Sequence, residues 1–60
     1  MKVDEYLEFS VDQCVEITKN GNMVFKGTIR EFQNYYYTIG QCEIEEEPYK
    51  LANTHYIKIK

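Results

Sequence analysis

Three side chains in this sequence could act as a nucleophile, a general base or a soft metal ligand: Cys14, Cys42 and His55. A cysteine nucleophile needs a neighbouring base, and a general base needs a positioned partner and a pocket. No family signature surrounds Cys14 or His55, and a structural zinc site needs four ligands, commonly with closely spaced thiols. We therefore interpret Cys14 as a small core residue and His55 as a strand-edge residue. We expect no catalytic residue, no metal and no cofactor, and so no enzymatic activity.

The strongest binding candidates are the consecutive tyrosines Tyr35, Tyr36 and Tyr37. In an extended strand, Tyr35 and Tyr37 would point to one face and Tyr36 to the other. Tyrosines can fill a core, anchor a protein interface or stack on unpaired bases. Of the two binding roles, the interface fits this chain better, so the sequence predicts a non-enzymatic module that binds a protein.

Base stacking needs nearby cations to hold the nucleic-acid backbone. The chain has seven basic against ten acidic residues and a net charge of −3, which disfavours a nucleic-acid partner. A weak single-stranded nucleic-acid binder therefore stays as the alternative function. Its cations would come from a basic edge formed by Lys26, Arg30, Lys50, Lys58 and Lys60.

An acidic run covers residues 43–47, with only Ile44 between its glutamates. On a strand, Glu43, Glu45 and Glu47 would share one face. These carboxylates could bind a basic surface or a cation, or they could simply keep exposed strands from aggregating. We include the three as binding candidates, and the partner we expect is a protein with a basic surface.

The whole chain of 60 residues is predicted to form a single small β-rich domain, residues 1–60. The amino terminus lacks the apolar run of a signal peptide, and no stretch approaches the roughly 20 apolar residues of a membrane span. We expect a cytoplasmic protein that does not bind membranes, with reduced cysteines; a disulfide between the two cysteines would require export. Unpaired sheet edges leave a homodimer open as an alternative.

The strand signals are strongest around Asn20-Gly21, where apolar and polar residues alternate on both sides of a turn dipeptide. This pattern predicts a hairpin whose second strand continues to Arg30, with a bulge or bend at Gly27. Strand signals also cover residues 35–39 and 41–45, which could form one bent strand or a tight pair, and a last strand is predicted at 55–60. Ile57 and Ile59 would form the inner face of the last one, after a turn at 51–54.

Two segments fit more than one structure. Residues 29–34 suit either the end of a strand or a turn of helix, because Ile29 and Phe32 have helical spacing. Residues 1–12 alternate at Leu7, Phe9 and Val11 as a strand would, yet they also carry a helical stripe. We favour an extended or mixed lead-in over residues 1–10.

The order of these features resembles small SH3-like β-barrels. Phe9–Ile17 is similar to their lead-in and first strand, Val24–Ile29 to their second strand with its bending glycine, and Leu51–Ile57 to the closing turn and strand. The resemblance implies a mostly β, antiparallel barrel. It does not imply proline-rich ligands, because the chain has no Trp.

The competing architecture is an α+β fold, a four-stranded ββαββ sheet with one helix near Arg30–Tyr36. The chain also resembles short proteins of bacteria, phages and mobile elements. A phage or mobile-element regulator or inhibitor of a host protein would fit the predicted protein-binding module.

Overall fold

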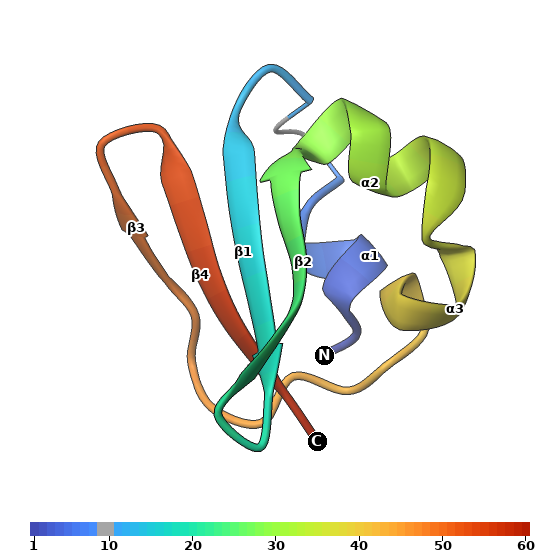
Figure 1. Cartoon of the computed structure of the whole chain (residues 1–60), viewed down its shortest axis with the longest axis vertical. Coiled ribbons are helices and arrows are strands. Elements are labelled where there is room, and N and C mark those ends of the chain that lie inside the picture. The colour runs from blue at the N-terminus through green and yellow to red at the C-terminus, as the bar shows by residue number, and fades with distance from the viewer. Residues whose placement is uncertain (9–10) are drawn as a thin grey trace.

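The computed structural model describes residues 1–8 and 11–60, and it consists of a four-stranded sheet with helices on one side (Figure 1). The sheet has the strand order β2-β1-β4-β3. Strand β1 pairs antiparallel with β2 and parallel with β4, while β3 and β4 are antiparallel. In chain order the elements are α1 (Val3–Tyr6), β1 (Cys14–Lys19), β2 (Asn22–Thr28), α2 (Ile29–Tyr35), α3 (Tyr37–Gly40), β3 (Tyr49–Leu51) and β4 (Thr54–Ile59).

The sheet is open, so the predicted SH3-like barrel is wrong. Strands β2 and β3 are its two edges, and they are not paired with each other. The α+β alternative with a helix near Arg30–Tyr36 fits the structure better. The barrel fails because the chain leaves the sheet at Thr28 and enters α2 instead of bending into another strand. The antiparallel prediction is also wrong for the central pair, where β1 and β4 run parallel.

The β1–β2 hairpin is confirmed. Asn20 and Gly21 have φ values of 53° and 81°, the positive angles that an Asn-Gly turn tolerates. The irregularity in the ladder lies at Val24, which has no partner between the pairs Ile17–Phe25 and Thr18–Met23. The predicted bulge at Gly27 is therefore misplaced. Gly27 serves another purpose, because a Cβ there would lie 3.0 Å from the Phe25 ring.

The predicted strand end at 29–30 and the strand at 35–39 are both wrong, because this region forms helices α2 and α3. Thr28 caps α2: its Oγ1 accepts from the Glu31 N–H, and the Glu31 carboxylate accepts from the Thr28 N–H. Ile29 and Phe32, three residues apart, are both buried on one face of the helix. This capping box and apolar spacing override the strand preference of the tyrosines.

The acidic segment also differs from the prediction of a strand at 41–45. Its only ladder contacts, among the residues that the structure describes, are isolated bridges from Glu43 to Lys2 and from Ile44 to Ile59. The short strand β3 follows, and sequence analysis did not predict it. The last strand is confirmed as β4, with Ile57 and Ile59 buried.

The amino-terminal segment is helical at Val3–Tyr6, so the helical alternative holds there and an extended lead-in does not. Val3 and Leu7 are both fully buried against the sheet. Phe9 and Ser10, which belong to the predicted strand alternation and to the barrel-like lead-in, lie outside the described residues.

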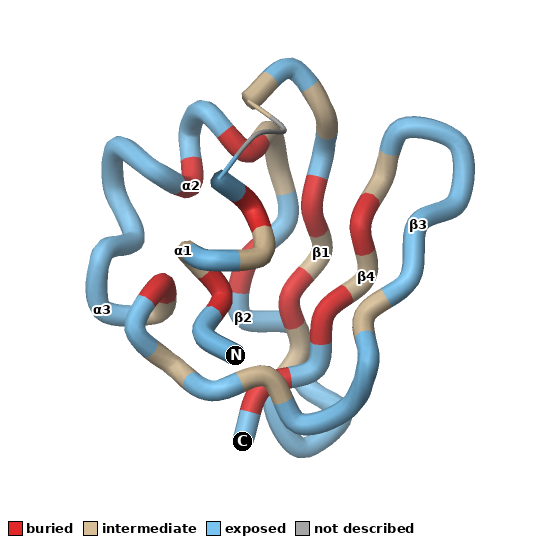
Figure 2. The backbone as a smooth tube through the Cα atoms, turned by 180° about the vertical axis from the view of Figure 1, so that it is seen from behind, coloured by how far each residue is buried: buried red, intermediate tan, exposed pale blue. Residues whose placement is uncertain are grey.

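One core joins the helices to a single face of the sheet, as the buried positions in Figure 2 show. Among the described residues, no helix lies on the opposite face of the sheet. No helix within residues 1–8 and 11–60 is long and apolar enough to cross a membrane. The core is formed by Val3, Leu7, Val15, Ile17, Phe25, Ile29, Phe32, Ile57 and Ile59.

Candidate functional site

His55 lies in the inner strand β4 and is only 7% exposed, so its predicted place at a strand edge is wrong. Its Nε2 donates to Gln13 Oε1, and its Nδ1 accepts from the Tyr6 hydroxyl at 2.9 Å. Burial, and secondarily the positive charge of Lys50, lower the pKa of His55. Burial raises the pKa of Tyr6. The neutral imidazole thus joins α1 to the sheet, and its contacts are structural.

The two cysteines are free and lie in different parts of the fold. Cys14 is exposed at the start of β1, so its interpretation as a core residue is wrong. Cys42 is half-buried after α3 and directs its Sγ toward the Thr38 carbonyl oxygen. Across residues 1–8 and 11–60, no three His, Cys, Asp or Glu side chains are arranged to hold a metal ion.

The tyrosine triplet runs from the end of α2 to the start of α3, and its members differ sharply in exposure. Tyr35 is 78% exposed and Tyr37 is 74% exposed, whereas Tyr36 is 38% exposed. The Tyr36 ring packs on Phe25 at 4.5 Å between ring centroids and lies parallel to Phe32 at 6.0 Å. Tyr36 therefore belongs partly to the core, while its two neighbours stand in solvent.

Two of the three tyrosines, Tyr35 and Tyr36, line an open groove between the edge strand β2 and helix α2. The groove has a volume of about 420 Å³. Tyr37 lies outside it. We call this surface the aromatic groove; its lining residues are Met23, Val24, Phe25, Lys26, Glu31, Tyr35 and Tyr36.

The aromatic groove contains apolar side chains that are exposed to solvent. Met23 is 51% exposed and Val24 is 37% exposed. One ammonium, from Lys26, and one carboxylate, from Glu31, lie among the lining residues, so the groove carries no net charge. The lining thus offers a partner both apolar side chains and polar groups.

Met23 and Val24 were not among the binding residues predicted from the sequence. A signal was present, because Met23-Val24-Phe25 interrupts the alternation of a half-buried strand. Phe25 faces the core, whereas the bulge at Val24 leaves Met23 and Val24 exposed on the free edge of the sheet.

The structure does not bring the acidic candidates to the aromatic groove. Glu43 accepts from the amino group of Met1 at 3.0 Å, and this contact lowers the pKa of Glu43. Glu45 and Glu47 line a separate hollow beside Met1, Ile44 and Pro48. The tyrosine triplet and the acidic run thus belong to distinct surfaces.

No protein-family model matches the sequence, and neither the curated proteins nor the solved structures include a significant match to this chain.

Proposed function

We propose that this chain is a non-enzymatic module that binds a protein partner through the aromatic groove. The observation that carries the proposal is the exposure of Met23, Val24 and Tyr35 around one concave surface. Tyrosine and methionine are enriched where proteins meet, and a tyrosine held by few rotatable bonds loses little entropy on binding.

The floor of the groove packs on the core, which favours recognition over loose contact. Tyr36 is fixed by its packing on Phe25 and Phe32, and both phenylalanines belong to the core. A partner side chain entering the groove would meet a preformed aromatic surface, so little ordering cost opposes binding. A module of this size could act as a regulator or inhibitor by occupying a functional surface of its partner.

The test selects displayed random peptides on the immobilised wild-type chain and measures their affinity for two variants. Tyr35→Ala removes a groove tyrosine, and Tyr37→Ala removes an equally exposed tyrosine outside the groove. We expect the selected peptides to bind Tyr35→Ala about tenfold more weakly, the usual loss at an interface anchor, and to bind Tyr37→Ala within about twofold of wild type. Equal binding to all three proteins, or a failure of the selection to enrich any peptide, would contradict the proposal.

A further inference from the structure

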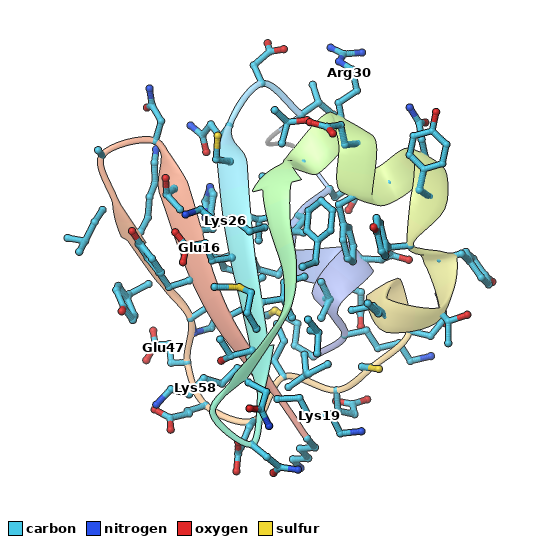
Figure 3. All side chains as sticks on the ribbon, in the orientation of Figure 1. Glu16, Lys19, Lys26, Arg30, Glu47 and Lys58 are labelled. Atoms are coloured by element: carbon cyan, nitrogen blue, oxygen red, sulfur yellow. The ribbon has the colours of Figure 1, made fainter. Side chains whose placement is uncertain are left out.

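A second surface, the uncovered face of the sheet, carries a stacked pair of tyrosines. Tyr49 on β3 and Tyr56 on β4 are register partners, with ring centroids 5.0 Å apart and an interplanar angle of 18°. Figure 3 views this face, with Glu16, Lys26 and Lys58 labelled on it. His55 and Ile57, which flank Tyr56 in β4, are buried. Because side chains alternate along a strand, the Tyr56 ring points to the opposite, uncovered face.

Two small hollows adjoin the tyrosine pair. The first has a volume of about 150 Å³ and lies over β1 and β4; the second has a volume of about 90 Å³ and lies toward the acidic segment. Both are lined by Tyr49, Tyr56 and Lys58. The first adds Glu16, Thr18 and Ile57, and the second adds Glu46 and Glu47.

The charge of this lining is negative. Three carboxylates, Glu16, Glu46 and Glu47, stand against one ammonium, Lys58. Lys58 Nζ lies 3.5 Å from Glu46 Oε1. Glu16 and Glu47 take part in none of the ion pairs within the described part of the chain, although Lys26 is the register partner of Glu16. Each hollow beside the tyrosine rings thus contains a carboxylate, Glu16 in one and Glu47 in the other, that makes no ion pair with the described residues.

We propose that this face binds an arginine side chain of the protein partner, with the guanidinium on the tyrosine pair and its N–H groups donating to Glu16 or Glu47. A guanidinium is planar, stacks on aromatic rings and offers five donors, whereas an ammonium is a compact, strongly hydrated charge. The inference rests on the proposed function and names the chemistry of the partner. On this proposal, the basic surface predicted for the partner contacts the uncovered face of the sheet and not the aromatic groove.

The experiment titrates the isotopically labelled full chain with the peptide acetyl-Gly-Arg-Gly-Arg-Gly-amide at low salt and follows the backbone amides by NMR. Saturable shifts are expected at Glu16, Thr18, Tyr49 and Tyr56, and they should weaken at high salt because exposed charges are screened. Replacing the peptide's arginines by lysines should reduce the affinity.

Two variants and one matched control sharpen this titration. Tyr49→Ala should weaken binding about threefold to fivefold, the usual contribution of an exposed cation–π contact, and Glu16→Gln should weaken it without changing the shape of the hollow. Leu51→Ala is the control, because Leu51 is as exposed on the same strand but lines neither hollow. It should bind within twofold of wild type.

Three results would overturn the arginine site: no saturable shift, shifts confined to residues 43–47, or shifts at Tyr49 and Tyr56 with a short oligothymidylate but not with the peptide. The last would mark a nucleic-acid surface. These results do not involve Tyr35, so the arginine site can fail while peptides selected on the aromatic groove still bind. If the selected peptides bound Tyr35→Ala as tightly as the wild type, the proposed function would fail instead.

Discussion

At the scale of single residues, the His55 imidazole connects helix α1 to the sheet through Tyr6 and to the turn before β1 through Gln13. Its burial, together with the charge of Lys50, lowers the pKa of His55 in the folded chain below the usual 6.5. The folded state therefore favours the neutral ring, and the unfolded chain takes up a proton first as pH falls.

This pKa shift predicts a pH-dependent stability. The free energy of unfolding should include the full His55 contribution above about pH 6.5 and decline below it, with a slope of up to about 1.4 kcal/mol per pH unit until the folded-state pKa is passed. Urea unfolding at a series of pH values between 5 and 7.5 measures this slope. His55 is the only histidine, so the His55→Gln variant should show a nearly flat profile in that window. A wild-type profile that is also flat would contradict the prediction.

Residue types alone predict only part of the role of the tyrosine triplet. The triplet could be recognised as a candidate surface from its composition, and Tyr35 does line the aromatic groove. The separate roles of Tyr36 and Tyr37 could not be predicted, because they depend on whether the segment is a strand or a helix. In a strand Tyr35 and Tyr37 share a face, whereas here only Tyr35 reaches the edge of the sheet beside Met23.

At the scale of elements, helix α2 begins at a capping box and ends at the groove tyrosine Tyr35. Thr28 Oγ1 accepts from the Glu31 N–H at 3.1 Å. The Thr28→Ala variant should lower the free energy of unfolding by about 1 kcal/mol, the usual cost of losing an N-cap. Thr38→Ala on α3 is the matched control, because the Thr38 side chain is exposed and makes no hydrogen bond among those described. Urea unfolding that gives both variants the same stability would show that the cap contributes nothing.

The predictable elements are those with a strong local signal. Asn20-Gly21 has the residue types of a tight turn, and the hairpin around it follows. The strand at Thr54–Ile59 follows from its alternation. From the sequence, helix α2 is only one of two possible structures for its segment. The helix signal of Thr28 and Glu31 competes there with tyrosines that favour strands. The three-residue strand β3 is too short to carry a periodic pattern.

At the scale of the whole molecule, the parallel pairing of β1 with β4 decides the architecture. It joins residues that are 40 apart in the sequence, such as Cys14 and Thr54, and no local pattern encodes such a pairing. It places β2 and β3 at opposite edges and leaves one sheet face open. Both proposed contact surfaces follow from this arrangement: the aromatic groove at the β2 edge and the tyrosine pair on the open face.

The most direct test of the account replaces single tyrosines by a photo-crosslinking residue, p-benzoylphenylalanine, in the full chain, which is then mixed with an extract of the organism that encodes it. The substitution at Tyr35 places the crosslinker in the aromatic groove, and the substitution at Tyr37 places it at an equally exposed position outside the groove. The account predicts a discrete covalent adduct with one protein after irradiation of the Tyr35 variant, and little or none with the Tyr37 variant. Adducts of equal yield from both positions, or from Tyr37 alone, would contradict the claim that the aromatic groove is where this module binds its partner.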